Sequence, residues 1–172
     1  MAQLFPDALR TDRLLLRRWA LDDAPALRAA VDASDAHLRP FIPWMRDEPR
    51  TLDQTRERVA GFIESFDAGE TFNWALWVGD ALVGEVMLMT RAGPGALEVG
   101  YWLHVDHVGR GYMREAVQAL VTLSDEAGNP RLEAWCAVTN ARSSAVVASL
   151  GFRQEREDED GGVTYGVWVR ER

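Results

Sequence analysis

Apolar and polar positions alternate along the chain in short periods that predict strands and amphipathic helices in succession. Residues 14–19 form a brief apolar run interrupted by charge, which is typical of a strand. Asp22 and Asp23 then precede Pro25, an arrangement that favours the first turn of a helix. Residues 39–50 carry three prolines among apolar side chains, so we expect an unusually apolar loop there.

A second helix is expected to begin after Thr51, whose hydroxyl can cap its first turn. The apolar side chains of this helix recur every three or four residues, so they would face inward together. That stripe consists of Thr55, Val59, Phe62, Ile63 and Phe66. The turn-forming residues at 67–69 are expected to end the helix.

The middle of the chain has the pattern of an antiparallel meander. Residues 72–78 and 81–89 are short apolar stretches joined at hairpin spacing by a Gly-Asp pair at 79–80. A Gly-Pro-Gly turn at 93–95 leads into a third strand over 96–105. The remaining expected elements are a helix over 111–127, a strand over 132–138, a helix over 141–150 and a final hairpin of 152–156 with 163–169.

Acidic residues crowd the turn of that final hairpin, at 155–160, and such a charge run is typical of a solvated loop. Strand–helix–strand units beside an antiparallel meander predict an α/β (α+β) fold with a mixed sheet. The length of 172 residues fits a single domain spanning 1–172. The hydrophobic content of 47% and the charged content of 27% are those of a globular chain rather than a disordered one.

The net charge of the chain limits the kinds of molecule that the protein is expected to bind. Twenty-seven Asp and Glu residues face 19 cations, all of them Arg, which gives a net charge of −8. A general nucleic-acid binder needs a basic surface, so we expect no nucleic-acid partner. An acidic chain attracts cationic partners such as amines and basic peptides. The absence of Lys excludes Schiff-base chemistry and a P-loop.

Targeting and metal-binding signals are absent from the sequence. No apolar run approaches the roughly 20 residues of a membrane span. The N-terminus lacks a basic region followed by an apolar core, so we expect a cytoplasmic protein without membrane association. Cys136 is the single cysteine, which excludes an intramolecular disulfide and makes a cysteine-based zinc site, and any metal site, unexpected. Because Cys136 lies in an apolar strand, we expect a core thiol rather than a nucleophile.

The segment HVDHVGRGYMREA, residues 104–116, predicts an anion site. Gly109 and Gly111 flank Arg110 directly before a helix, and glycines there let backbone N–H groups converge on a phosphate. Arg110 and Arg114 would add charge-assisted hydrogen bonds. The loop is neither a Walker loop nor a dinucleotide fingerprint, because Lys and a third Gly are missing. The alternative is a tight strand-to-helix turn that binds nothing.

Four motifs carry a family resemblance. EVGYWLHVDHVGRGYMREAV, residues 98–117, resembles the central acyl-CoA motif of the GNAT superfamily of N-acyltransferases. NARSSAVVASLGF, residues 140–152, resembles the motif that follows it in that superfamily. TDRLLLRRWALDDAPAL at 11–27 and HLRPFIPWM at 37–45 narrow the resemblance to ribosomal-protein N-terminal acetyltransferases of the RimJ/RimL type. The resemblance extends from about residue 11 to residue 168.

This resemblance implies both a fold and a reaction. The GNAT fold is a mixed, mostly antiparallel central sheet flanked by helices, and its splayed central strands hold acyl-CoA. The implied reaction is transfer of an acetyl group from acetyl-CoA to a primary amine, here a protein or peptide N-terminal α-amine, by direct attack with a carboxylate general base. The alternatives are a small-amine or antibiotic acetyltransferase, a succinyl-CoA-using acyltransferase, and a non-catalytic CoA-binding or interaction module. A homodimer is also implied by the resemblance.

The resemblance further implies catalytic roles. Glu98 is the expected general base, and the alternative is a structural carboxylate that pairs with backbone or Arg groups. His104 is the rival base, or else a surface residue at the end of the strand, and Glu85 on the neighbouring strand is a weaker alternative. Val147 stands where many members carry a general-acid Tyr. Protonation of the departing thiolate would therefore fall to Ser143 or to water.

Binding residues are implied in the same way. Those expected to bind acetyl-CoA are Leu103, His104, Val105, Gly109, Arg110, Gly111, Tyr112, Met113, Arg114, Asn140 and Ser143. Phe41, Trp44 and Glu98 are expected at the acceptor groove, although the two aromatic residues would equally suit packing beneath the next helix. Val108 and Met113 depart from the family's loop pattern, but their backbone amides remain able to bind phosphate.

Overall fold

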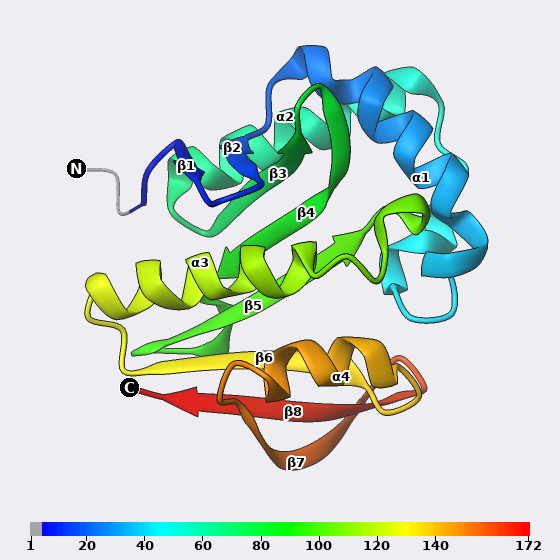
Figure 1. The fold of residues 1–172 in the computed structure, drawn as a ribbon. Coiled ribbons are helices and arrows are strands. Elements are labelled where there is room, and N and C mark those ends of the chain that lie inside the picture. Colours follow the sequence, from blue (N-terminus) through cyan, green and yellow to red (C-terminus); the bar gives the residue numbers. More distant parts are fainter. Residues whose placement is uncertain (1–4) are drawn as a thin grey trace.

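The computed structural model describes residues 5–172, whose strands join in one mixed sheet (Figure 1). The strands are β1 (Ala8–Arg10), β2 (Leu15–Arg18), β3 (Thr71–Val78), β4 (Ala81–Met89), β5 (Ala96–Leu103), β6 (Arg131–Ala137), β7 (Arg153–Asp160) and β8 (Val163–Glu171). Their order across the sheet is β1-β2-β3-β4-β5-β6-β8-β7. Neighbours are antiparallel except β5 and β6, which run parallel. The expected mixed, mostly antiparallel sheet is confirmed.

Helices cover both faces of this sheet (Figure 1). They are α1 (Ala24–Leu38), α2 (Leu52–Ala68), α3 (Tyr112–Glu126) and α4 (Ala141–Ala148), with short 3-10 turns η1 (Leu21–Asp23), η2 (Pro43–Asp47), η3 (Thr90–Ala92) and η4 (Val105–His107). Successive side chains of a strand point to opposite faces. On β5, Val99 therefore joins the apolar core beneath α3, whereas Trp102 joins the core beneath α1 and α2.

Local sequence sets both ends of α2 as expected. The Thr51 hydroxyl accepts a hydrogen bond from the Gln54 N–H at 3.2 Å, and the Gln54 side chain accepts one from the Thr51 N–H at 2.9 Å. This reciprocal pair is a capping box. Gly69 ends the helix in the left-handed conformation, with φ of 73°. Val59 and Phe66 of the expected inward stripe are buried.

The acidic run at 155–160 is part of a strand, so the expected solvated loop is wrong. It belongs to β7, the edge strand that pairs with β8, and every β7 side chain is exposed. A strand without buried positions has no apolar alternation in its sequence. Charged side chains on an edge strand hinder pairing with a strand of another chain. The strand β1 was not expected either, because three residues are too few to show a pattern.

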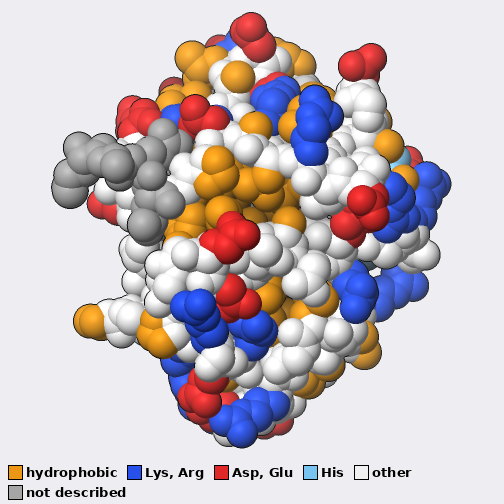
Figure 2. Space-filling view, turned by 60° about the vertical axis from the view of Figure 1, so that its left-hand side comes forward, with side chains coloured by type: hydrophobic (Ala, Val, Ile, Leu, Met, Phe, Trp, Pro, Cys, Tyr) orange, Lys and Arg blue, Asp and Glu red, His pale blue; other side chains and the backbone are white. Residues whose placement is uncertain are grey.

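Arginines and carboxylates are interspersed on the surface (Figure 2). Arg131 donates to Glu133 at 2.8 Å and to Glu155 at 2.7 Å. Arg170 of β8 donates to both carboxylate oxygens of Asp125 on α3 at 2.8 Å. Arginine therefore pairs with carboxylates on both β6 and α3, although the net charge is −8.

Glu48 holds the apolar loop at 39–50 against α1 and α2. Its side chain is 1% exposed and accepts hydrogen bonds from Arg28 Nη1 at 2.5 Å and from Arg50 Nη1 at 2.8 Å. Burial raises the pKa of this carboxyl, but the hydrogen bonds from Arg28 and Arg50 outweigh burial and bring the pKa below its usual value. Met45 of the same loop is completely buried, so this loop contributes to the core.

Replacing Glu48 by Gln removes the buried charge with which Arg28 and Arg50 pair. We expect E48Q to lower the free energy of unfolding at pH 7 by about 3 kcal/mol, measured by urea denaturation. A carboxyl whose pKa is lowered by folding stabilises the protein above the pKa of the unfolded state, and this contribution is lost as the pH falls through the folded-state pKa. The difference between the two proteins should therefore shrink on acidification.

The matched control is E64Q, since Glu64 is exposed on α2. That substitution should change the free energy of unfolding by less than about 0.5 kcal/mol. Equal stability of E48Q and the unsubstituted protein at pH 7 would show that the Glu48 ion pairs do not hold the loop.

Candidate functional site

The sheet opens between β5 and β6, and a pocket lies in the opening. The two strands pair only over residues 96–99 and 131–134. Beyond that point β5 continues beside β4 and β6 continues beside β8, so the facing edges of β5 and β6 have no strand partner in the described chain. Residues 100–103 and 135–137 line the resulting pocket, which has a volume of about 940 Å³. Cofactor and ligand sites commonly have volumes of this size.

The start of α3 forms one end of this pocket. Gly109 and Gly111 have φ values of 75° and 80°, a region that glycine adopts without steric cost, and they turn the chain from β5 into α3. No side chain caps α3, and the N–H of Glu115 makes the first helical hydrogen bond. Within the described chain the N–H groups of residues 112–114 have no acceptor. Free N–H groups at a helix N-terminus form an anion site.

Two arginines were expected at this anion site, and only one lines the pocket. Arg114 is part of the pocket wall, and its Nε donates to the Ser149 hydroxyl at 3.2 Å. Arg110 lies off the wall, where its Nη2 donates to the Asp106 carbonyl at 3.1 Å. Arg110 therefore braces the loop from outside the pocket.

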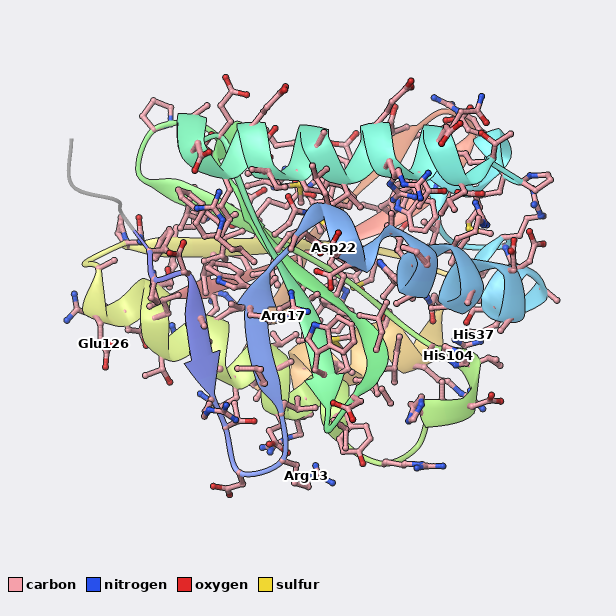
Figure 3. All side chains as sticks on the ribbon, turned by 90° about the horizontal axis from the view of Figure 1, so that it is seen from above. Arg13, Arg17, Asp22, His37, His104 and Glu126 are labelled. Carbon is pink, nitrogen blue, oxygen red and sulfur yellow. The ribbon has the colours of Figure 1, made fainter. Side chains whose placement is uncertain are left out.

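Arg13 is a further brace of this loop, and sequence analysis missed it. It lies in the turn between β1 and β2 (Figure 3). Its guanidinium donates to the Arg110 carbonyl at 2.8 Å and to Glu115 at 2.7 Å, and it lies 4.7 Å above the centre of the Tyr112 ring. No local sequence pattern predicts a contact between Arg13 and Arg110 or Glu115, because these residues are about 100 positions apart in the chain.

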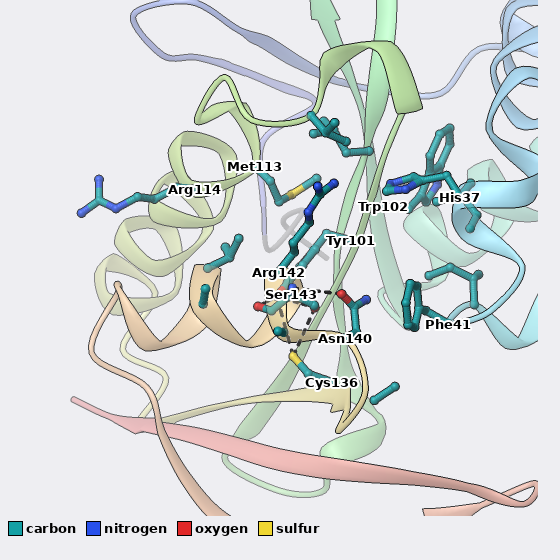
Figure 4. A pocket seen from close by; sticks show the side chains of 18 of the residues that line it. His37, Phe41, Tyr101, Trp102, Met113, Arg114, Cys136, Asn140, Arg142 and Ser143 are labelled. Atoms are coloured by element: carbon teal, nitrogen blue, oxygen red, sulfur yellow. Dashed lines mark hydrogen bonds between the residues drawn. The ribbon is translucent and has the colours of Figure 1, made fainter.

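Three polar side chains meet on the wall formed by β5, β6 and α4 (Figure 4). The Ser143 hydroxyl lies 3.0 Å from the Tyr101 hydroxyl and 3.3 Å from the Cys136 sulfur, and it can donate to either. The Tyr101 hydroxyl donates to the Ser143 carbonyl at 2.9 Å. Burial raises the pKa of Tyr101 and also the pKa of Cys136, so both groups carry their protons at neutral pH. The cluster is neutral and rich in donors.

Asn140 begins α4 and lines the same wall. Its side-chain oxygen accepts a hydrogen bond from the Ser143 N–H at 3.2 Å, so Asn140 caps the helix. Val147, at the position of a tyrosine in many GNAT members, is completely buried. The phenol nearest to Ser143 is instead Tyr101, which comes from β5.

The opposite wall comes from α1 and the loop that follows it. Phe41 lines the pocket as expected, together with Trp102 of β5 (Figure 4). His37, in the last turn of α1, also lines the pocket and was missed, since an isolated histidine on a helix has no motif around it. Burial lowers the pKa of His37, and the charge of Arg142 on α4 lowers it further.

Glu98, the expected base, does not line the pocket. Its side chain is buried, and its two oxygens accept hydrogen bonds from Arg91 at 2.7 and 2.5 Å. Glu98 lies opposite Glu133, in the part of β5 that is still paired with β6. Glu98, which was expected as the base at the acceptor groove, is therefore outside the pocket. The weaker alternative, Glu85, is completely buried behind Trp102, whose indole N–H donates to it at 3.4 Å.

Three more expected residues lie away from the pocket wall. The His104 N–H donates to the Val83 carbonyl at 2.8 Å, and the Val105 N–H donates to the Ser34 hydroxyl at 3.1 Å, so neither N–H is free. Of residues 103–105 only Leu103 lines the pocket. Trp44 packs edge-on against Trp102 at 6.3 Å between ring centres, but it does not line the pocket itself.

Within the described residues 5–172, no cluster of three His, Cys, Asp or Glu side chains is arranged to hold a metal ion. No helix in that range has the length and apolar character needed to cross a membrane.

A family model described as "Acetyltransferase (GNAT) domain" matches residues 13–153. The probable N-acetyltransferase YjcK of Bacillus subtilis is 30% identical over 128 residues, which are 71% of this chain and 70% of YjcK. The ribosomal-protein-serine acetyltransferase of Escherichia coli is 31% identical over 103 residues, which are 58% of this chain and 57% of that protein.

Solved structures share the fold along nearly the whole chain. RimL, a ribosomal L7/L12 α-N-protein acetyltransferase in complex with coenzyme A, superimposes with a TM-score of 0.86, at 23% identity and over 95% of this chain and 97% of RimL. The microcin C7 self-immunity acetyltransferase MccE, in complex with acetyl-CoA and AMP, has a TM-score of 0.89 at 18% identity over the whole of both chains. At these identities the two structures establish the fold and nothing further.

The raised pKa of Cys136 predicts slow reaction with alkylating agents. Only the thiolate is nucleophilic, and a buried thiol forms it at a higher pH than a free one. We expect iodoacetamide at pH 8 to modify the folded protein at least about tenfold more slowly than the same protein in urea, with the rate rising as the pH increases. Mass spectrometry of quenched samples measures the fraction of Cys136 that has been alkylated at each time. Equal rates in the folded and unfolded states would show that the thiol is not buried as described.

Proposed function

The chain belongs to the GNAT family of acetyl-CoA-dependent N-acetyltransferases, and on that premise we propose that it acetylates the N-terminal α-amine of a protein or peptide. The observation that carries the proposal is the gap between β5 and β6, with free N–H groups of α3 at one end and the Tyr101–Ser143 hydrogen bond on its wall. A thioester with a long anionic tail needs both features in one cavity.

The residues of the pocket fit acetyl-CoA. We assign the pyrophosphate to the N–H groups at 112–114, where glycines keep Cβ atoms away, and to the guanidinium of Arg114. The pantetheine arm would lie along the unpaired edge of β5 near Leu103 and past Asn140. This arrangement leaves the thioester end of the molecule at the neutral cluster of Tyr101, Cys136 and Ser143. Acetyl-CoA supplies the activated acyl group.

Ser143 is proposed to assist the departure of the thiolate. Its hydroxyl is a donor on the pocket wall, and the Tyr101 hydroxyl beside it is held in place by the Ser143 carbonyl. As the carbon–sulfur bond breaks, the Ser143 hydroxyl donates its proton to sulfur and regains one from the nitrogen that has been acylated. Ser143 would thus act as the general acid, a role that Val147 cannot perform because its side chain has no acidic proton.

The acceptor side of the pocket supports an N-terminal amine. Phe41, Trp102 and Trp135 form apolar surface there, which suits the side chains and backbone of a peptide end. The net charge of −8 favours a basic polypeptide over an acidic one. The E. coli relative is named for acetylating a ribosomal-protein serine. A small amine is the second candidate, because the same aromatic wall would accept a flat molecule. MccE, which shares the fold, is named for immunity to microcin C7.

Thiol release from acetyl-CoA separates these acceptors. We expect a serine-initiated basic hexapeptide to release coenzyme A at least about tenfold faster than benzylamine at equal concentration, since only the peptide fills the acceptor side. The same peptide with its N-terminus already acetylated is the control and should release none above hydrolysis. Faster reaction of benzylamine would favour the small-amine candidate. Binding of acetyl-CoA without any thiol release would show a binding module instead.

Gly111→Val tests the assignment of the pyrophosphate. With φ at 80°, a β-branched residue strains the turn, and its side chain would project where the anion is assigned, beside the Arg13 guanidinium at 3.4 Å. We expect the affinity for coenzyme A, measured by calorimetry, to fall at least about tenfold.

The control for this substitution is Gly128→Val at the other end of α3. Gly128 has a similar φ of 77° and open space around its Cβ position, so it bears comparable backbone strain away from the pocket. Its affinity for coenzyme A should match that of the unsubstituted protein. Equal loss in both variants would show that backbone strain, and not a pyrophosphate at this loop, causes the effect.

A further inference from the structure

His37 is distinctive among the side chains of the pocket because it can take up a proton at neutral pH. The other wall residues with ionisable or acidic hydrogens are Tyr101, Tyr112, Arg114, Cys136 and Arg142. Arginine remains protonated, and the phenol and thiol groups are donors rather than bases. Among the described residues, no Asp or Glu lines the pocket. An acceptor ammonium nevertheless has to lose a proton before its nitrogen can attack.

We propose that the imidazole of His37 is the general base that deprotonates the acceptor amine. This proposal rests on the proposed function, because it assigns a role in that same reaction. It replaces the carboxylate expected from the sequence, since Glu98 is bound to Arg91 outside the pocket and Glu85 is enclosed behind Trp102.

The position of His37 suits this role. It lies on the wall formed by α1 and the following loop, beside Trp102, and faces Arg142, Asn140 and Ser143 on α4 across the pocket (Figure 4). An acceptor that enters along Phe41 and Trp102 would therefore meet the imidazole before it reaches the cluster around Ser143.

Both imidazole nitrogens of His37 are available. Within the described chain, no side chain or backbone group forms a hydrogen bond with them. In His104, by contrast, Nδ1 accepts a hydrogen bond from the Asp106 N–H at 3.1 Å. His104 and His107 also lie off the pocket wall and pack against each other, with 5.3 Å between ring centres. His37 is thus the histidine that presents an unshared nitrogen lone pair to the pocket.

The surroundings keep His37 neutral. Burial lowers its pKa, and Arg142 on α4 opposes a second positive charge nearby. From η4, which packs against α1, the titratable groups are His104, Asp106 and His107. On the end of α1 itself, the Asp35 carboxylate is bound by Arg39 and is not free to pair with an imidazolium. At pH 7 the imidazole is therefore in the form that accepts a proton.

Of the protons on the acceptor nitrogen, one passes to His37 and a second passes to the departing sulfur. The acceptor R–NH₃⁺ transfers one proton to the neutral imidazole, which becomes imidazolium, and the freed R–NH₂ attacks the thioester carbonyl carbon. The nitrogen–carbon bond forms, and the carbon–sulfur bond breaks as the tetrahedral intermediate collapses. The second nitrogen-bound proton passes by way of the Ser143 hydroxyl to the departing sulfur. The products are the amide and coenzyme A thiol, and the imidazolium then releases its proton to solvent.

The test measures kcat and KM against pH with acetyl-CoA and the serine-initiated hexapeptide. We expect kcat of the unsubstituted protein to fall on acidification through a pKa below 6.5, as His37 becomes protonated. In His37→Gln this acidic limb should be lost, and kcat at pH 7 should fall about 100-fold, with partial recovery at high pH, where the amine deprotonates unaided. The KM for acetyl-CoA should stay within about twofold, because binding of the donor is unchanged.

The matched control is His107→Gln. His107 also has a lowered pKa, caused first by burial and then by His104, but it lies off the pocket wall. This variant should retain the acidic limb of the unsubstituted protein. Loss of the limb in His107→Gln and its retention in His37→Gln would overturn the assignment.

Chemical rescue separates a base from a structural residue. In His37→Ala, added imidazole should restore kcat in proportion to its concentration, and substituted imidazoles of higher pKa should restore it more. A merely structural role would give no such dependence on pKa. Thiol release by His37→Gln within about threefold of the unsubstituted rate, with the acidic limb intact, overturns His37 alone. No thiol release by the unsubstituted protein from any acceptor overturns the proposed function and this role with it.

Discussion

The functional architecture depends on the point where the parallel pairing of β5 and β6 stops. Four residues of each strand pair, after which β5 follows β4 and β6 follows β8. Parallel strands need a crossover connection, and here α3 provides it, so the first turn of α3 has to lie at the end of β5 where the gap opens. Ligand sites of open α/β sheets form at such carboxyl ends. The pocket and the free N–H groups at 112–114 both follow from this break.

The closed part of the sheet contains a buried ion pair, whereas the polar groups in the gap between β5 and β6 are neutral. Where the sheet is closed, Glu98 is buried together with a cation, Arg91, because an unpaired buried carboxylate would be strongly destabilising. Inside the gap the polar groups are the neutral hydroxyls of Tyr101 and Ser143 and the thiol of Cys136. In the proposed function these neutral groups would contact the thioester, and proton uptake would fall to His37 on the other wall.

The overall charge and the ligand appear to conflict, since a chain of net charge −8 binds a polyanion. Screening resolves the conflict, because exposed charges act over only about 10 Å at 0.1 M salt. Surface carboxylates such as Glu155 and Asp125 are also paired with arginine, at 2.7 and 2.8 Å. In the proposed assignment, binding of the anion would therefore depend on donors that contact it directly, namely the amides at 112–114 and the guanidinium of Arg114.

The cap at Thr51, the cap at Asn140 and the Gly-rich turn were all predictable, because each depends on backbone geometry within a few residues. The same holds for the fold class, since hydrophobic periodicity and motif order were enough to indicate a mixed sheet. The position of Glu98 could not be predicted in this way, because the register of β5 against β6 decides that Glu98 lies in the closed part of the sheet and outside the pocket. By itself, then, the sequence determined the fold class, the family and the glycine-rich turn before α3, but it did not indicate β1 or the full length of β7. Only the tertiary structure decided that His37 of α1 shares a pocket with Ser143 of α4, because packing between segments far apart in the chain sets that contact.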